Sequence, residues 1–230
     1  MRKFERLVRH VRKRYRSFKQ PRRGADVCAD LASIMKPRTI FDVGANIGQS
    51  AVKFRRRFPE AQIHCFEPSA SNADRIRTRS IKNVEVHQVA LGSTAATAML
   101  SQGADPATFH ISENGDAQIR IETIDAFCAE NGIERIDFLK IDTEGHDLEV
   151  LKGAVAMLDA GRVVAVQVEA GMNPENTFHI PFEALKAFLE DHGYRLFGFY
   201  DQVTEWPTKQ PHLRRANPMF VSHEIFSKAR

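Results

Sequence analysis

The chain has 230 residues, enough for one domain with a well-buried core. Hydrophobic residues make up 43% of it and charged residues 27%, as in ordinary globular proteins, and no apolar run is long enough to span a membrane. The N-terminus lacks the apolar stretch of a signal peptide, and the three cysteines lack the spacing of metal ligands or of a disulfide framework. We therefore expect a cytoplasmic protein.

Positive charge is concentrated at the N-terminus. Residues 1–23 hold eleven Lys or Arg and one acid, whereas the rest of the chain holds 22 bases and 28 acids. Because the body is acidic, we do not expect it to bind nucleic acid. We divide the chain into this N-terminal segment, 1–23, and one domain, 24–230.

Hydrophobic side chains recur at helical spacing within residues 1–19, with arginines between them. This pattern predicts a basic amphipathic helix. Such a helix can bind peripherally to the anionic inner face of a membrane or to a partner's acidic surface. A helix docked on the domain and a solvated arm are the alternatives.

From residue 39 onwards the pattern alternates between strands and helices. Apolar strands are predicted at 39–43, 62–66 and 84–89, with helices at 47–58 and 69–80 between them. An irregular insert follows. Its strands at 96–100 and 118–122 flank a long loop up to Ala117, which we interpret as a functional lid.

The alternation resumes after the insert and ends with two strands. The predicted elements are helix 123–131, strand 136–141, helix 146–159, strand 163–168, helix 182–191, and strands 194–200 and 217–222. This order is typical of an α/β protein with a parallel, doubly wound sheet. Apolar stripes on the helices at 146–159 and 182–191 are interpreted as core.

The first strand runs directly into a glycine-containing turn at residues 42–50, where a helix begins. Glycine lets a backbone approach a ligand closely, and doubly wound sheets bind ligands at the carboxyl ends of their strands. The turn lacks the Gly-Lys-Ser/Thr ending of a P-loop, and Asn46 and Gln49 stand where a dinucleotide fingerprint has glycine. A nucleoside without phosphates is the ligand that remains.

The second strand ends with Glu67, followed by Pro68. An acid at this tip is positioned to accept hydrogen bonds from both hydroxyls of a ribose. The alternative is an acid stabilised by the dipole of the following helix. Because Glu67 comes after the glycine turn, we favour the ribose.

Ordered segments of the chain resemble the FkbM family of methyltransferases, and the resemblance spans residues 39–222. It is carried by residues 42–48, 66–68, 139–145, 151–154 and 217–221. It implies a class I methyltransferase fold, a Rossmann-like sheet of seven strands with the last antiparallel. It also implies S-adenosylmethionine as cofactor and O-methylation of a sugar, glycolipid or natural-product hydroxyl.

By position in these motifs, we expect the cofactor to contact the glycine turn and the tips of the second and third strands. The residues are Asp42, Gly44, Ala45, Asn46, Gly48, Gln49, Ser50, Glu67 and Ala90. Gly44, Asn46 and Gly48 would line the methionine part, and Glu67 the ribose. The third strand ends without the acid that holds the adenine amine in many class I enzymes, so the adenine contacts stay open.

Methyl transfer to a hydroxyl needs positioning of the oxygen and a group that takes its proton. The candidate catalytic residues follow the fourth and fifth strands and are Asp142, Glu144, His146 and Glu169. We expect Asp142 to lie nearest the reaction. The alternative is that Asp142 and Glu144 cap the next helix while Glu169 is solvated.

The same carboxylates could bind a divalent ion that acidifies the hydroxyl, but their spacing is no dedicated metal signature and we assign no metal ligand. His110 and His179 are further candidate bases. Lys140 is expected to pair with an acid, and Trp206 is a candidate acceptor contact.

Two functions from other classes are alternatives. One is a non-catalytic nucleotide-binding or membrane-associated scaffold that retains the fold, and the other is a dehydrogenase, which Asn46 and Gln49 disfavour. Acceptor choice would depend on segments 101–117, 170–181 and 201–216, which carry no recognisable code. The oligomeric state is not readable from the sequence.

Overall fold

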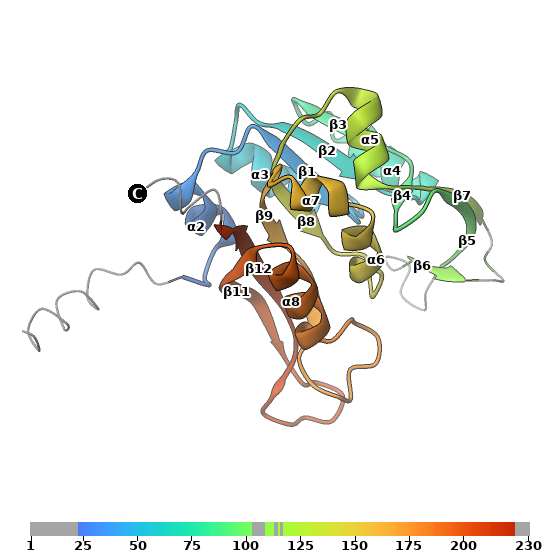
Figure 1. Ribbon diagram of the computed structural model, residues 1–230. Coiled ribbons are helices and arrows are strands. Elements are labelled where there is room, and N and C mark those ends of the chain that lie inside the picture. Colours follow the sequence, from blue (N-terminus) through green and yellow to red (C-terminus); the bar gives the residue numbers. More distant parts are fainter. Residues whose placement is uncertain (1–22, 103–108, 113–114, 116, 224–230) are drawn as a thin grey trace, which may run out of the picture.

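The computed structural model describes residues 23–102, 109–112, 115 and 117–223 (Figure 1). The helix predicted at residues 1–19 lies outside the described residues, so its contact with a membrane stays a prediction. Within the described part, no helix is both long and apolar enough to cross a membrane.

The main sheet has the predicted doubly wound topology. Its strand order is β3-β2-β1-β8-β9-β12, and β11 and the short β10 both pair with β12. The parallel strands are β1 (Thr39–Val43), β2 (Gln62–Phe66), β3 (Val84–His87), β8 (Ile136–Ile141) and β9 (Val163–Gln167). The final strand, β12 (Leu213–Ser222), runs antiparallel to β9, β10 (Ala170–Gly171) and β11 (Tyr194–Thr204). The expected antiparallel last strand is confirmed.

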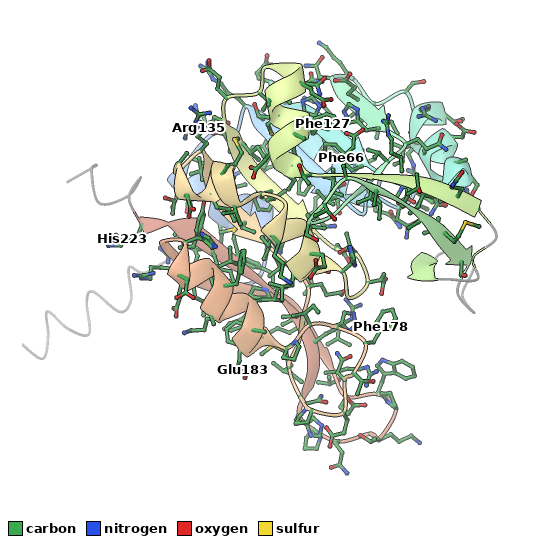
Figure 2. The ribbon with its side chains drawn as sticks, turned by 45° about the vertical axis from the view of Figure 1, so that its right-hand side comes forward. Phe66, Phe127, Arg135, Phe178, Glu183 and His223 are labelled. Atoms are coloured by element: carbon green, nitrogen blue, oxygen red, sulfur yellow. The ribbon has the colours of Figure 1, made fainter. Side chains whose placement is uncertain are left out.

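Helices cover both faces of this sheet (Figures 1 and 2). One face carries α2 (Val27–Ile34), α3 (Gln49–Arg57) and α4 (Ala70–Thr78). The other carries α5 (Ile124–Asn131), α8 (Phe182–Asp191) and two short helices between them. All residues of β8 and β9 are buried, as expected of central parallel strands covered on both faces. No element is predicted at α2, which begins after its N-cap Asp26.

The insert forms a second sheet instead of an open loop. The sheet has the order β4-β7-β5-β6, from β4 (Ala90–Leu91), β5 (Ala96–Gln102), β6 (Phe109–Ser112) and β7 (Ala117–Glu122). The prediction of an unbroken loop up to Ala117 is therefore wrong at β6. This strand forms by antiparallel pairing with β5. A segment of four residues is too short for its sequence alone to predict such pairing.

The prediction of a single helix at 146–159 is also wrong, because the structure has two helices there, α6 (Asp147–Lys152) and α7 (Val155–Asp159). A Cβ at Gly153, between them, would lie 2.0 Å from the carbonyl oxygen of Gly92. The Asp125 carboxylate, on α5, accepts hydrogen bonds from the first turn of α7. Leu151 and Leu158 are buried, so the predicted core stripe survives the break.

Strands β11 and β12 are longer than predicted, and the outer part of their hairpin projects from the main sheet (Figure 1). The loop after β10 lies beside this hairpin, because Asn173 and Asn176 donate hydrogen bonds to the carbonyls of Leu213 and Arg214. The hairpin and this loop therefore form one lobe at the end of the sheet.

Candidate active site

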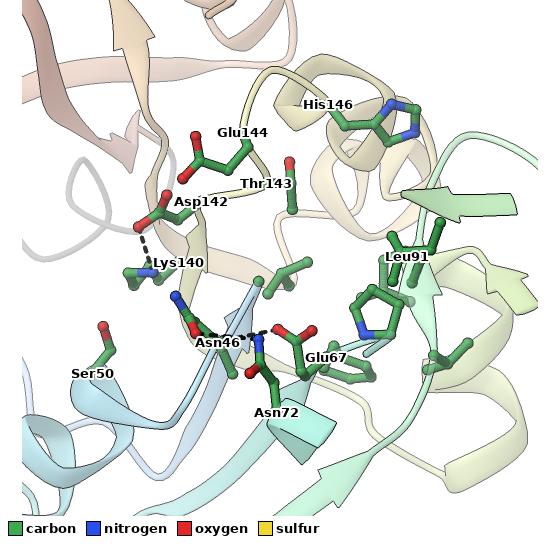
Figure 3. Close-up of a pocket in the computed structure, with 18 of the residues that line it drawn as sticks. Asn46, Ser50, Glu67, Asn72, Leu91, Lys140, Asp142, Thr143, Glu144 and His146 are labelled. Carbon is green, nitrogen blue, oxygen red and sulfur yellow. Dashed lines mark hydrogen bonds and ion pairs between the residues drawn. The ribbon is translucent and has the colours of Figure 1, made fainter. Parts of the chain in front are cut away.

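A cavity of about 490 Å³ opens at the carboxyl ends of β1, β2 and β8 (Figure 3). The glycine turn after β1 and the start of α4 line one part of it, and the loop after β8 lines another. Leu91 and Leu100 add a wall from the second sheet. This is the place where doubly wound sheets bind ligands, and the volume suits a small molecule.

The glycine turn needs glycine for reasons of backbone geometry. Gly44 has φ +74°, and a Cβ there would lie 1.9 Å from the carbonyl oxygen of Asp142. The amides of Gly44 and Ala45 both donate to the carbonyl of Phe66, which holds the turn against β2. The turn thus brings the ends of β1, β2 and β8 into contact without side chains between them.

Glu67 points into the cavity from the end of β2 (Figure 3). Its carboxylate is buried and accepts hydrogen bonds from the amides of Asn46 at 2.8 Å and Ser69 at 2.9 Å. Burial raises the pKa of Glu67 to about 7, although the two amides act in the opposite direction. No lysine, arginine or histidine of the described residues is among the groups that shift this pKa.

Lys140 lies between two carboxylates beneath the cavity. Its Nζ is 3.3 Å from Asp42 and 3.1 Å from Asp142. Burial alone would lower the pKa of Lys140, but the carboxylates of Asp142 and Asp42 raise it above its usual value. Lys140 therefore stays charged and orients Asp142, and the expected pairing with an acid is confirmed.

The loop after β8 presents Asp142, Glu144 and His146 to the cavity (Figure 3). Glu144 has φ +54°, a left-handed conformation that costs energy for a side chain with a Cβ. Burial raises the pKa of Glu144, with Asp142 adding to the effect, and burial lowers the pKa of His146. Asp142 and Glu144 do not cap α6, whose N-cap is His146 without a side-chain hydrogen bond.

Asp147 fixes this loop from below. Its buried carboxylate accepts hydrogen bonds from the amide and hydroxyl of Thr143 and from the amide of Glu169. Burial raises the pKa of Asp147 to about 7. The loops after β8 and β9 are therefore tied together by one side chain.

Glu169 is buried and not solvated, and it is not among the residues that line the cavity. Its carboxylate pairs with His179, at 2.9 Å, and with Arg215. Burial lowers the pKa of His179, although nearby acids act against it. One ligand atom each of Glu144, Glu169 and His179 lie within 4.8 Å of one another. A second cluster of this kind, His64, Glu85 and His87, lies on β2 and β3.

Most residues predicted for the cofactor line the cavity: Gly44, Ala45, Asn46, Gln49, Ser50, Glu67 and Ala90. Asp42 does not line it and pairs with Lys140, and Gly48 does not line it either. The sequence pattern does not predict Asn72, which lines the cavity from α4 and donates to Asn46. Nothing in the local pattern singles out that asparagine. The cofactor and catalytic roles of all these residues stay predictions.

Two further candidates lie away from this cavity or outside the description. Trp206 is 69% exposed, stacks over Arg214 and does not line the cavity. The side chain of His110 lies outside the described residues, so its predicted role stays a prediction.

The charge of the cavity lining selects among ligands. Three acids line it, Glu67, Asp142 and Glu144, whereas Lys140, the one lysine or arginine among its described lining residues, is paired with Asp142 and with Asp42. Such a lining repels phosphate groups and attracts cationic ones. This agrees with the exclusion of a P-loop and of a dinucleotide from the turn.

Comparisons with known proteins identify a family for this chain. The model of the methyltransferase FkbM domain matches residues 42–196. The hexuronic acid methyltransferase AglP of Haloferax volcanii is 28% identical over 150 residues, which cover 63% of this chain and 62% of that protein. The 2-O-methyltransferase NoeI of Sinorhizobium fredii is 28% identical over 188 residues, covering 70% and 77%. The chain thus matches less than two thirds of the length of AglP.

Among solved structures, TrmK of M. capricolum, in complex with S-adenosyl-homocysteine, is similar to this chain with a TM-score of 0.49 and 10% identity. The similarity covers 85% of this chain and 67% of TrmK.

Proposed function

The chain belongs to the FkbM family of S-adenosylmethionine-dependent methyltransferases, and we propose that it methylates a hydroxyl of a sugar or glycan. The names of two relatives, a hexuronic acid methyltransferase and a 2-O-methyltransferase, support a carbohydrate acceptor. The family favours an enzyme over a scaffold or a dehydrogenase.

The residues of the cavity fit the cofactor. S-adenosylmethionine, when bound, supplies a methyl group on a positively charged sulfur. The observation that carries the proposal is the acidic lining, with the carboxylate of Glu67 buried at the tip of β2 and held by two backbone amides. Glu67 would accept hydrogen bonds from the ribose hydroxyls, and the turn at Gly44 would let the backbone approach the methionine part.

The loop after β8 would hold the acceptor. A hydroxyl held there would accept the methyl group that the cofactor supplies, with a C–O bond formed as the C–S bond breaks, and would lose its proton to a base. We assign the base to Asp142, because Lys140 orients it and the cavity exposes it. Glu144 and His146 line the same side of the cavity and would position the acceptor.

Calorimetric titration with S-adenosylhomocysteine, NAD and ATP tests the cofactor. We expect the wild type to bind S-adenosylhomocysteine selectively, and Glu67→Gln to weaken binding about 10- to 100-fold through loss of charged hydrogen bonds. Glu60→Gln, which changes an exposed acid before β2, serves as the matched control.

Transfer is then measured with methyl-labelled S-adenosylmethionine and a panel of acceptors, including uronic acids and neutral sugars. Label in the sugar that survives mild alkaline hydrolysis, which cleaves methyl esters but not methyl ethers, supports the proposal. Selective cofactor binding without transfer to any hydroxyl would contradict it.

A further inference from the structure

Three loops that are distant in sequence bring two carboxylates and an imidazole together beside the cavity. Glu144 follows β8, Glu169 follows β9, and His179 precedes α8. Their ligand atoms lie within 4.8 Å of one another. Glu169 and His179 are buried, while Glu144 is half-buried and faces the cavity (Figure 3).

The surroundings of His179 determine which ring nitrogen carries hydrogen. Its Nδ1 lies 3.0 Å from Oδ1 of Asn176. The side-chain oxygen and nitrogen of Asn176 can be told apart by their partners. Oδ1 accepts hydrogen bonds from the backbone amides of Phe178 and His179, and Nδ2 donates one to the carbonyl of Arg214. The Nδ1–H group therefore donates to Asn176. A histidine oriented in this way presents the lone pair of Nε2, as metal-binding histidines commonly do.

That nitrogen lies close to a carboxylate. Nε2 of His179 is 2.9 Å from Oε2 of Glu169, and no described residue donates a hydrogen bond to this buried oxygen. Two acceptors at this distance need a positive centre between them, either a proton or a cation. Arg215 already neutralises the other oxygen of Glu169, so a further proton on His179 is not needed to balance the carboxylate.

Glu144 distinguishes the two cases. An ion pair of His179 with Glu169 would need no third member, yet Glu144 adopts φ +54° next to Gly145 and brings its carboxylate to the pair. A Cβ at Gly145 would lie 2.3 Å from the carbonyl oxygen of Phe178. The loop after β8 therefore packs closely on the loop that carries Phe178 and His179 (Figure 2). Strain of this kind, held by tight packing, is typical of functional sites.

We infer that Glu144, Glu169 and His179 form a binding site for a divalent cation. Carboxylates with one imidazole suit ions such as Mn²⁺ or Zn²⁺. Three protein ligands leave positions for oxygen atoms from outside the protein. The role of this site rests on the proposed function. The open positions would take the acceptor hydroxyl and a neighbouring oxygen, and the cation would lower the pKa of that hydroxyl next to Asp142.

Binding of Mn²⁺ to the full chain, freed of metal with a chelator, tests the site by electron paramagnetic resonance. We expect Glu144→Gln and His179→Gln each to weaken Mn²⁺ binding at least about tenfold. His87→Gln, which removes a histidine from the cluster on β2 and β3, should leave the affinity unchanged. Pulsed measurements should also detect a histidine nitrogen coupled to the Mn²⁺ of the wild type.

Absence of Mn²⁺ and Zn²⁺ binding at millimolar concentration would overturn the inference, and so would loss of binding in His87→Gln alone. Retained binding of S-adenosylhomocysteine shows that a variant is folded. Since Glu144 is half-buried, Glu144→Gln keeps the test open if His179→Gln fails to fold.

The proposed function and the cation site can be rejected independently of each other. Hydroxyl methylation by metal-free protein, without Mn²⁺ binding, would reject the cation site and keep the proposed function. Mn²⁺ binding at these residues in a protein that methylates no hydroxyl would reject the proposed function and keep the site.

Discussion

The two halves of the main sheet build their parts of the cavity differently. In the first half, residues 39–91, a glycine turn and one acid at a strand tip form much of the cavity lining, and both come directly after regular strands. In the second half, residues 136–222, the lining comes from the end of β8 and the loop after it, which contains the strained residue Glu144 and is held by Asp147. On the proposed function, the first half would hold the cofactor and the second half the acceptor.

The largest expected effect lies in the second half. Asp142→Asn should lower kcat about 100-fold or more, because the proposed base loses its charge, and should leave the affinity for S-adenosylhomocysteine nearly unchanged. Initial rates with labelled cofactor measure this. Asp74→Asn, on the exposed face of α4, is the control, and full activity of Asp142→Asn would remove Asp142 from the chemistry.

Gly44→Ala probes the first half through its backbone. The positive φ and the clash with the Asp142 carbonyl should lower the free energy of unfolding by about 3 kcal/mol. Gly132→Ala is the matched control, because Gly132 has φ +65° but open space around its Cβ, and should cost only about 1 kcal/mol. Chemical denaturation measures both. Equal losses would show that the contact with the end of β8 is unimportant.

The pH dependence of cofactor binding tests the contrast between the two halves, because we expect it to arise from the titration of Glu67 in the first half. Ribose hydroxyls donate to the ionised carboxylate, so affinity should fall about tenfold per unit as the pH drops below the pKa of about 7. The same raised pKa means that Glu67 stabilises the ligand-free fold at low pH and that this contribution is lost as the pH rises through 7. Calorimetry over about pH 6 to 8 should give a flat profile for Glu67→Gln; a sloping one would assign the titration elsewhere.

The smallest effect is expected at the outer end of the second half. Trp206→Ala should change the free energy of unfolding by less than about 0.5 kcal/mol, because the ring is exposed. Affinity for the cofactor product should stay unchanged. If the hairpin contacts the sugar, the acceptor KM should rise about threefold, the size of a weak aromatic contact. An unchanged KM would separate the hairpin from acceptor binding.

The sequence by itself determined the alternation of strands and helices, the glycine turn and the position of Glu67. These follow from hydrophobic periodicity and from residues adjacent in the chain, and such patterns are local. The pairing of Lys140 with acids was predictable for a similar reason, because a lysine within a buried strand needs a partner.

Only the tertiary structure decided the rest. The break at Gly153 depends on the carbonyl of Gly92, and α7 is capped by Asp125 from another helix. The pairing of Glu169 with His179, and the place of Asn72 in the cavity, likewise join segments that are far apart in the chain. Contacts of this kind leave no periodicity in the sequence, because each depends on where packing brings a backbone or side chain from another element.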